Sequence, residues 1–356
     1  SPQPEYDPTF YYDIPVVFHV IQNTSGAGFL SASTIQDQID VLNEDFQAIV
    51  GSPGAPGTNA NIRFYLATND PQGNATNGIT YSTNNNWYMD SGNYWDTLAW
   101  DTNRYFNIYT NAVPCCYGYV ADFPQTGIVG TNEDRVVLWW EAVGKQPTSG
   151  YPGNMGRTAT HEAGHYFGLY HTFDSGCGSA TNCYGTGDLI CDTNGQRNPT
   201  YGCPSSSSSC GSQDPFHNYM DYSDDACFWE FTPEQVNRMR CVLENWRPDL
   251  WTGSSPTLSV SNLVAGQTAL VEVWNATPNN RSHFAWSLNG GGPISTPFGD
   301  AMLTPPYQLR LLQTDSTGYA SYTGSIPVQA AGITVWCHGT DVGTQSMLNA
   351  LMLVVQ

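Results

Sequence analysis

Residues 161–171 read HEAGHYFGLYH, and the spacing of the histidines restricts how this segment can fold. His161 and His165 are four residues apart, so a helix places both imidazoles on one face. Gly168 can adopt the positive φ that ends a helix and turns the chain. His171 can then return from the following loop to the same point. Three convergent imidazoles leave one coordination position of a zinc ion open, which is typical of catalytic rather than structural zinc.

Glu162 directly follows the first of these histidines. From there its carboxylate can reach a water molecule at the metal without binding the metal. Such a group takes a proton from the water as it attacks a carbonyl carbon, and then passes the proton to the leaving amine. The motif therefore predicts zinc-dependent hydrolysis, with His161, His165 and His171 as ligands and Glu162 as the general base.

A second stretch, HNYMDY at residues 217–222, supports this interpretation. A methionine-bearing turn downstream of an extended HExxHxxGxxH motif is the metzincin arrangement. We expect Met220 to lie beneath the zinc as an apolar floor. The phenol of Tyr222, two residues on, could donate a hydrogen bond to the developing oxyanion. An ordinary core tyrosine is the alternative for Tyr222.

The charge balance excludes several classes of partner. Acidic residues number 31 against 11 basic ones, which gives a net charge of −20, and Lys145 is the only lysine. Such a surface repels phosphate backbones and anionic lipids, so we expect neither nucleic-acid nor membrane partners. No apolar run is long enough to span a bilayer.

Ten cysteines is an even number, and eight of them lie between Cys115 and Cys227. This density indicates disulfide bonds and an oxidising, extracellular compartment. The sequence begins at Ser1 without a signal peptide, so we interpret it as the mature form of a secreted protein. We also expect it to be a monomer.

The chain length suggests two domains, because single domains usually have roughly 100–200 residues. A break near residues 251–256 separates a region of mixed helices and strands, residues 1–252, from residues 256–356. The second region has short alternating strands at the spacing of an all-β sandwich. We expect helices over Thr34–Phe46 (capped by Ser33 or Thr34), Arg157–Tyr170 and Thr232–Trp246 in the first region. Two long loops are also expected there, over Asn69–Asn86 and Ser175–Pro215.

The motifs lie in a longer stretch that resembles the pappalysin family of metzincin peptidases. The segments HEAGHYFGLYHTF, GDLICDT and DPFHNYMDYSDDACFWEFTPEQVNRM follow the family's order, and IPVVFHVI and NIRFYLA match upstream. The resemblance covers about residues 10–248. It implies an α+β domain with a mixed five-stranded sheet, helices, and zinc in a horizontal cleft. It also implies that an edge strand at Tyr117–Phe123 pairs with an extended polypeptide substrate, and that Tyr222 assists the transition state.

The family includes calcium-binding members, and GDLICDT places Asp188 and Thr193 at the matching positions. Hard oxygen donors on a flexible loop suit Ca²⁺. Cys191 stands where the family pattern often has another acid, so the ligand set can differ. A solvated acidic loop without an ion is the alternative.

Six cysteines are disulfide candidates. The resemblance implies two bonds, Cys203–Cys227 and Cys183–Cys210. A third bond, Cys177–Cys191, is then possible. The neighbours Cys115 and Cys116 receive no partner, because adjacent cysteines rarely bond each other without strain.

The resemblance further implies a preference for Arg or Lys just after the scissile bond, at P1′. The family places the acid of this pocket directly before its last cysteine. Here Ala226 stands at that position, and Asp224 and Asp225 come before it. We take these two acids as candidates for the pocket and the basic preference as a hypothesis.

Two other functions fit parts of the sequence. Residues 256–356 contain no catalytic motif, so the chain could be an adhesion or binding protein with a vestigial zinc site. It could also be a zinc hydrolase that acts on an amide other than a peptide bond. The intact Glu162 argues against the first alternative, because a structural zinc site has no need of a base. The expected edge strand argues against the second. We therefore expect a secreted zinc endopeptidase.

Overall fold

The computed structural model describes residues 10–146, 151–315 and 317–356, so most of the N-terminal lead-in lies outside the described residues. The chain divides into two compact units, Ser1–Gly253 and Ser254–Gln356. Each unit has a hydrophobic core of its own.

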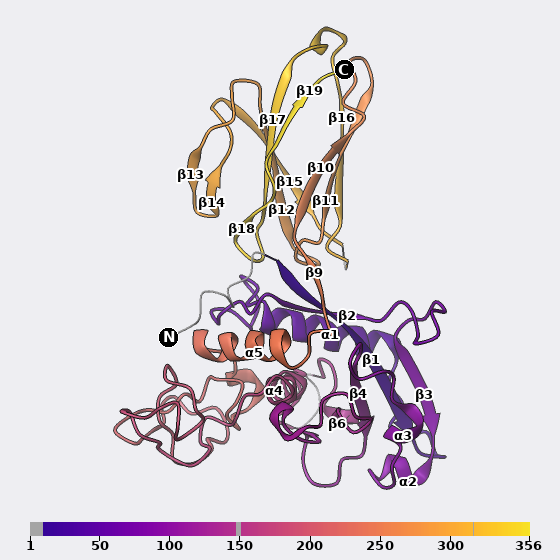
Figure 1. Ribbon diagram of the computed structural model, residues 1–356, viewed down its shortest axis with the longest axis vertical. Helices are drawn as coiled ribbons and strands as arrows, with labels where there is room; N and C mark the ends of the chain where they lie inside the picture. Colours follow the sequence, from indigo (N-terminus) through magenta and orange to yellow (C-terminus); the bar gives the residue numbers. More distant parts are fainter. Residues whose placement is uncertain (1–9, 147–150, 316) are drawn as a thin grey trace. The chain divides into compact units, whose positions relative to one another are not determined.

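The first unit is built on a mixed sheet in the order β2-β1-β4-β6-β5, to which β3 and β9 add through β1 (Figure 1). β1 pairs in parallel with β2, β3 and β4, and β6 continues the sheet in parallel with β4. β5 runs antiparallel to β6 and forms one edge. The strand bounds are β1 (Tyr11–Gln22), β2 (Ile62–Leu66), β3 (Ile79–Thr83), β4 (Phe106–Asn111), β5 (Gly118–Val120), β6 (Val136–Trp139) and β9 (Thr252–Ser254). The expected mixed sheet is thus confirmed.

Alternation along β1 divides the interior of this unit. Val16, Phe18 and Val20 join the main core with residues of the long helices, whereas Val17 and Ile21 belong to smaller clusters. This is the period of two that a strand buried on both faces requires. The helices of the unit are α1 (Ala32–Phe46), α2 (Asn85–Tyr88), α3 (Trp95–Leu98), α4 (Arg157–Tyr166) and α5 (Pro233–Asn245).

The helix ends differ in part from the sequence prediction. α5 begins as expected, because Thr232 and Gln235 form a reciprocal capping box. α1 begins earlier than expected: Ser31 has extended backbone and its hydroxyl accepts from the Thr34 amide at 3.2 Å. The predicted caps Ser33 and Thr34 are therefore wrong.

α4 ends at Tyr166 rather than Tyr170, and Gly168 follows with a φ of +87°. The predicted loop over Asn69–Asn86 contains β3. Its sequence, ITYST, buries only Ile79, so backbone pairing with β1 rather than hydrophobic pattern defines this strand.

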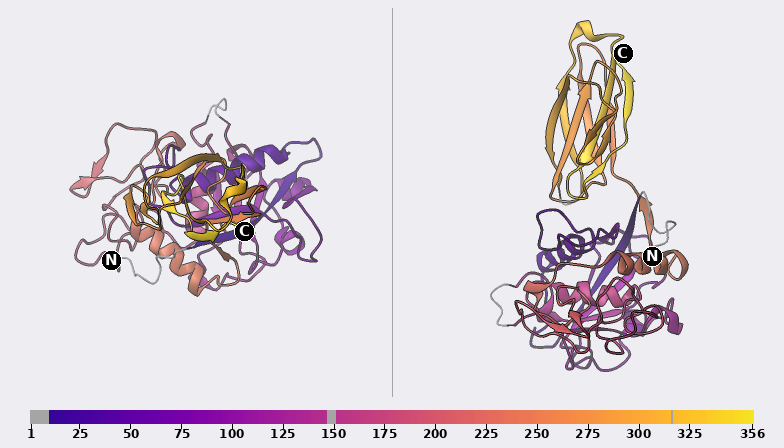
Figure 2. Two further views of the ribbon diagram at one scale, coloured as in Figure 1. Left: turned by 90° about the horizontal axis from the view of Figure 1, so that it is seen from above. Right: turned by 90° about the vertical axis from the view of Figure 1, so that its left-hand side faces the viewer.

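The second unit is a β-sandwich, as expected (Figure 2). Its core draws Leu258 and Val271 from one sheet and Phe284, Leu312 and Val335 from the other. The three-stranded sheet contains β10 (Thr257–Ser261), β11 (Thr268–Trp274) and β16 (Ala320–Ser325). The five-stranded sheet contains β12 (Arg281–Ser287), β15 (Tyr307–Gln313), β17 (Thr334–Asp341), β18 (Ser346–Met347) and β19 (Leu351–Val354), and a separate hairpin contains β13 (Ile294–Thr296) and β14 (Gly299–Ala301).

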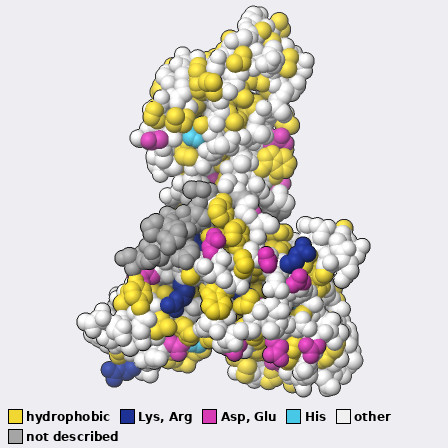
Figure 3. Space-filling model, in the orientation of Figure 1, with side chains coloured by type: hydrophobic (Ala, Val, Ile, Leu, Met, Phe, Trp, Pro, Cys, Tyr) yellow, Lys and Arg dark blue, Asp and Glu magenta, His cyan; other side chains and the backbone are white. Residues whose placement is uncertain are grey.

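The surface agrees with the unusual composition. Figure 3 shows a face dominated by uncharged atoms, with few dark-blue basic groups. Across the described ranges, none of the helices has both the length and the apolar character needed to cross a bilayer.

Arg247, just after α5, is a charged residue buried in the first unit. Its guanidinium lies 2.9 Å and 2.5 Å from the two carboxylate oxygens of Asp134, and both side chains are about 1 % exposed. The same guanidinium lies 3.5 Å from the ring centroid of Tyr166 at the end of α4. We predict that Arg247→Leu lowers the free energy of unfolding by about 3–5 kcal/mol, because the Asp134 charge stays buried without its partner.

Urea denaturation of the variant measures this loss. Lys145→Ala is the matched control, since Lys145 pairs with Glu44 on the surface with 43 % of its side chain exposed. It is expected to cost less than about 1 kcal/mol. Equal losses in the two variants would contradict the prediction.

Candidate active site

The three predicted histidines come together at one point. α4 carries His161 and His165, and the chain turns at Gly168 so that His171 faces them. The three Nε2 atoms lie 3.0, 3.1 and 3.2 Å from one another. Among the described residues, this is the group of His, Cys, Asp or Glu side chains whose ligand atoms converge closely enough to hold a metal ion.

Hydrogen bonds at the opposite ring nitrogens orient two of these imidazoles. His161 Nδ1 donates to the Tyr219 carbonyl at 2.6 Å, and His165 Nδ1 donates to the Leu169 carbonyl at 2.7 Å. Because a carbonyl only accepts, each Nδ1 carries the proton and each Nε2 directs a lone pair toward the centre. Burial lowers the pKa of His165 to about 4 and that of His171 to about 3, so the rings are neutral at pH 7. Lone pairs that face one another repel unless a cation lies between them, and this donor set fits zinc.

A buried carboxylate joins α1 to the segments that carry and orient the histidines. Asp45, near the end of α1, accepts hydrogen bonds from the Thr160 hydroxyl at 2.7 Å and the Tyr219 hydroxyl at 2.9 Å. Arg157 Nη2 lies 3.4 Å from the same carboxylate. Tyr219 in turn provides the carbonyl that orients His161. Sequence reasoning missed Asp45, although an acid between the apolar positions of an amphipathic helix is a recognisable signal.

Met220 is fully buried and packs against α4 between the two helical ligands. A Cβ placed on Gly164 would lie only 2.4 Å from the Met220 sulfur. The absence of a side chain at residue 164 therefore allows the methionine to approach the helix backbone. The role of Met220 as an apolar floor beneath a metal ion stays a prediction.

Glu162 lies on the other side of the helix from this floor, against the edge strand β5. A Cβ on Gly118 would lie 2.9 Å from Glu162 Cγ and 3.0 Å from Thr158 Cγ2. The Glu162 side chain is buried, and burial raises the pKa of its carboxyl to about 8. A cation held by the nearby imidazoles opposes that rise, because it favours the charged carboxylate.

The ladder between β5 and β6 leaves part of the β5 backbone free to bind another strand. Trp139 N donates to the Tyr117 carbonyl at 2.7 Å, and Ala121 N donates to the Arg135 carbonyl at 3.3 Å. Residues 117, 119 and 121 therefore direct their backbone groups toward β6. The backbone groups of Gly118 then face outward, beside Glu162.

Tyr222 lies next to the histidines but is not a core residue. Its ring centroid is 4.8 Å from that of His171 and 5.6 Å from that of His161, and 42 % of the residue is exposed. The ring of Phe173, which sequence reasoning missed, stacks on His171 with centroids 4.7 Å apart. The core alternative for Tyr222 does not agree with this exposure.

Of the two candidate pocket acids, Asp225 binds backbone amides at the start of α4. Its carboxylate accepts from the Met155 amide at 2.8 Å and the Arg157 amide at 3.0 Å, so it caps the start of α4. It is buried, and burial raises the pKa of its carboxyl to about 6. Asp224 is half-buried.

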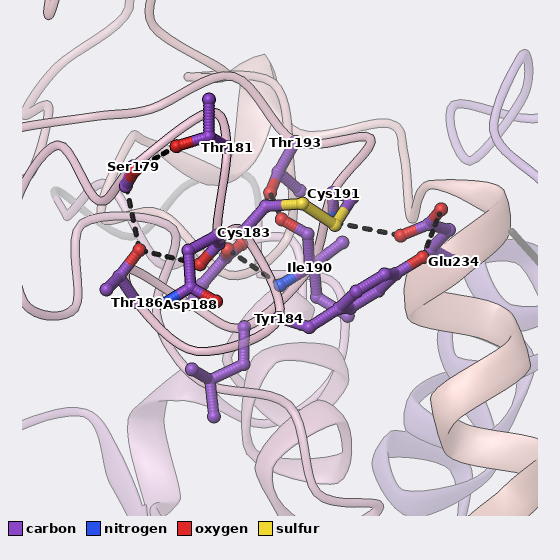
Figure 4. The surroundings of a disulfide bond; sticks show 12 residues. Ser179, Thr181, Cys183, Tyr184, Thr186, Asp188, Ile190, Cys191, Thr193 and Glu234 are labelled. Carbon is purple, nitrogen blue, oxygen red and sulfur yellow. Dashed lines mark hydrogen bonds between the residues drawn. A yellow bond between two sulfur atoms is a disulfide. The ribbon is translucent and has the colours of Figure 1, made fainter.

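The two candidate calcium ligands lie together in the loop before α5 (Figure 4). Thr193 Oγ1 donates to Asp188 Oδ2 at 2.7 Å, and the Ile190 amide donates to Asp188 Oδ1 at 3.1 Å. Arg238 of α5 donates to the backbone carbonyls of Asp188 and Leu189. A calcium site here stays a prediction.

The disulfide pairing was predicted only in part. Cys203–Cys227 is confirmed. The two other expected pairs are wrong, and the bonds are instead Cys177–Cys210 and Cys183–Cys191. The neighbours Cys115 and Cys116, which the sequence analysis left without a partner, bond each other. The Cys183–Cys191 bond closes a short loop that contains Asp188, as Figure 4 shows. Cys210 therefore pairs with the more distant Cys177. A small hairpin of β7 (Ser208–Ser209) and β8 (Ser212–Gln213) lies beside Cys210.

We predict that Gly164→Ala destabilises the protein by about 1–3 kcal/mol, although Gly→Ala inside a helix is normally stabilising. The new methyl group displaces the Met220 side chain from beneath the histidines. Thermal unfolding of Gly164→Ala, Met220→Ala and the double variant measures the coupling. The cost of Gly164→Ala is expected to shrink when residue 220 is alanine, and strictly additive losses would argue against the contact.

Comparison with known proteins agrees with this geometry. The family model described as pregnancy-associated plasma protein-A matches residues 74–244. An extracellular metalloprotease of Pyricularia oryzae is 37% identical over 248 residues, which cover 66% of this chain and 76% of that protein. One from Verticillium alfalfae is 36% identical over 246 residues, which cover 66% of this chain and 78% of that protein.

A solved structure shares the fold of the first unit. Mature mirolysin of Tannerella forsythia, solved in complex with a cleaved peptide, is 36% identical and superposes with a TM-score of 0.58. The match covers 68% of this chain and 97% of that chain. With the converged histidines and the identity to the fungal enzymes, these matches show that the chain belongs to the pappalysin family of extracellular metalloproteases.

Proposed function

We propose that this protein is a zinc-dependent endopeptidase that cleaves extended polypeptides at the site formed by His161, Glu162, His165 and His171. The observation that carries the proposal is the position of Glu162. Glu162 directly follows His161 on α4, and its side chain packs against Gly118 of the edge strand β5. The candidate base therefore lies on the same helix as two of the histidines and next to the strand whose edge is free.

The free edge suits a polypeptide rather than a small amide. An extended chain can pair with an exposed strand through main-chain hydrogen bonds, which requires no particular side chain. β5 provides outward groups at Gly118 and Val120. The cleaved peptide in the mirolysin complex supports the same substrate class by similarity.

The chemistry follows from the groups in place. A bound zinc ion supplies a Lewis acid that polarises the scissile carbonyl and makes a water molecule more acidic. Glu162 takes a proton from the attacking water and then donates it to the leaving amine. The phenol of Tyr222, beside His171, donates a hydrogen bond to the carbonyl oxygen as negative charge develops.

We predict that Glu162→Gln lowers kcat/KM for a peptide substrate by at least about a hundredfold, because the amide cannot accept the proton. The variant keeps the three histidines, so its zinc content by mass spectrometry is expected to equal that of the wild type. A zinc chelator should abolish wild-type cleavage. Wild-type rates in Glu162→Gln would contradict the proposal. A folded, zinc-loaded wild type that cuts no peptide would favour the adhesion alternative.

We further propose that Asp224, rather than Asp225, gives the S1′ pocket its preference for Arg or Lys. Asp225 already binds the first amides of α4, whereas Asp224 lies one residue before it and is half-buried. A carboxylate in a pocket favours a cationic side chain.

The expected result is that Asp224→Asn removes the basic preference at P1′ in a digested peptide library. Asp225→Asn is the matched control, and it should lower the thermal stability while it leaves the P1′ profile basic. A wild-type profile without Arg or Lys at P1′ would contradict the proposal for both acids.

The Asp188–Thr193 loop carries the calcium prediction. If Ca²⁺ binds there, it stabilises the folded state by mass action, so the midpoint of thermal unfolding rises with Ca²⁺ concentration. Asp188→Ala should abolish that rise, and Asp70→Ala, in a loop with exposed residues, should not. A midpoint that is independent of Ca²⁺ in the wild type would favour the ion-free loop.

A further inference from the structure

An aromatic cluster lies beside the reaction centre and takes no part in the chemistry above. It consists of Tyr117, Trp139 and Tyr151. The rings of Tyr117 and Trp139 are stacked with centroids 5.6 Å apart, and Trp139 lies 4.4 Å from Tyr151. Tyr117 is 40 % exposed, and the two other residues are half-buried. The cluster therefore offers an apolar, flat surface to a ligand.

The Tyr117 end of the cluster lies close to α4, the helix that carries the proposed general base. Thr158 lies on α4 one turn before Glu162. A Cβ on Gly153 would lie 3.2 Å from the Tyr117 ring and 3.3 Å from Thr158 Oγ1, and Thr158 also meets Gly118. Gly153 thus lies between the Tyr117 ring and Thr158, whereas Trp139 packs on the sheet face opposite α4, with Tyr109 and Tyr119.

Its position relative to the candidate P1′ acid indicates which part of the substrate it meets. The Pro152 carbonyl accepts from the Asp225 amide at 3.0 Å. This bond joins the segment that holds Tyr151 to the segment that holds Asp224. The cluster therefore lies toward the side where residues after the scissile bond would bind.

Side chains alternate along an extended chain. If the P1′ side chain points toward Asp224, the P2′ side chain points the opposite way. The residue that flanks the free edge in that direction is Tyr117, which immediately precedes Gly118 in β5.

We propose that Tyr117, Trp139 and Tyr151 form an S2′ subsite that binds an aromatic or large apolar side chain of the substrate. The inference rests on the proposed endopeptidase function. Aromatic rings attract one another in stacked or edge-to-face arrangements beyond the effect of burial. The Tyr151 hydroxyl donates to Glu141 Oε2 at 2.7 Å, which fixes that ring as one wall of the subsite.

Two peptides that differ only at P2′, with Phe or Ser, test the subsite. The wild-type enzyme is expected to cleave the Phe peptide with a kcat/KM about tenfold higher, the range for one apolar group in a pocket. Tyr117→Ala and Tyr151→Ala should reduce this ratio to about twofold, mainly by slowing cleavage of the Phe peptide. Tyr117→Phe keeps the ring and should keep the preference.

Tyr81→Ala is the matched control, because Tyr81 is 46 % exposed and lies on β3, away from the β5 edge of the sheet. It should retain the wild-type ratio. Equal wild-type rates for the two peptides, or an unchanged ratio in a folded Tyr117→Ala protein, would overturn the subsite while the endopeptidase function stands. Failure of the zinc-loaded wild type to cleave any peptide would overturn the endopeptidase function itself.

Discussion

The active site depends on one buried carboxylate that lies far from it in the sequence. Asp45 joins α1 to α4 through Thr160 and to the methionine turn through Tyr219. A carboxylate buried at this depth is tolerated only when its partners stay in place, because an unpaired buried charge costs several kcal/mol. The three segments are therefore held together whether or not a metal is bound. The Tyr219 carbonyl then fixes the ring of His161, so the carboxylate positions a metal ligand that it does not contact.

A second carboxylate fixes the start of the same helix. Asp225 binds the amides of Met155 and Arg157, and the Leu169 carbonyl holds His165 beyond the other end of α4. The Nε2 lone pairs of His161 and His165 face the centre because these hydrogen bonds leave the two rings little freedom to turn. A site built in this way carries electrostatic repulsion that a cation removes, and strong binding of zinc is the expected consequence.

The sequence predicted those parts of the site that depend on local geometry. His161 and His165 are related by the helical repeat, and Gly168 turns the chain within three residues, so little three-dimensional information is needed. The predicted partners of Cys177 and Cys183 were wrong, because disulfide pairing there depends on the path of an irregular loop that no periodicity describes. The prediction that Asp225 lines the substrate pocket fails for a similar reason. Whether an acid caps a helix or lines a pocket depends on which amides lie within about 3 Å of it, and residues 155 and 225 are distant in sequence.

The loop between His171 and the methionine turn has little regular structure, yet it must hold Tyr222 beside the histidines. Side-chain hydrogen bonds and disulfide bonds hold this loop in place of a hydrophobic core. Gln196 receives a hydrogen bond from Thr172 and donates one to Asp221, which lies between Met220 and Tyr222. Three disulfides close the same region. Cross-links restrict the unfolded chain more than they strengthen the folded one, so a long polar loop can remain ordered without burying apolar surface. This requirement ties the geometry of the site to an oxidising compartment, since reduction would release the segment that carries Tyr222 and Asp224.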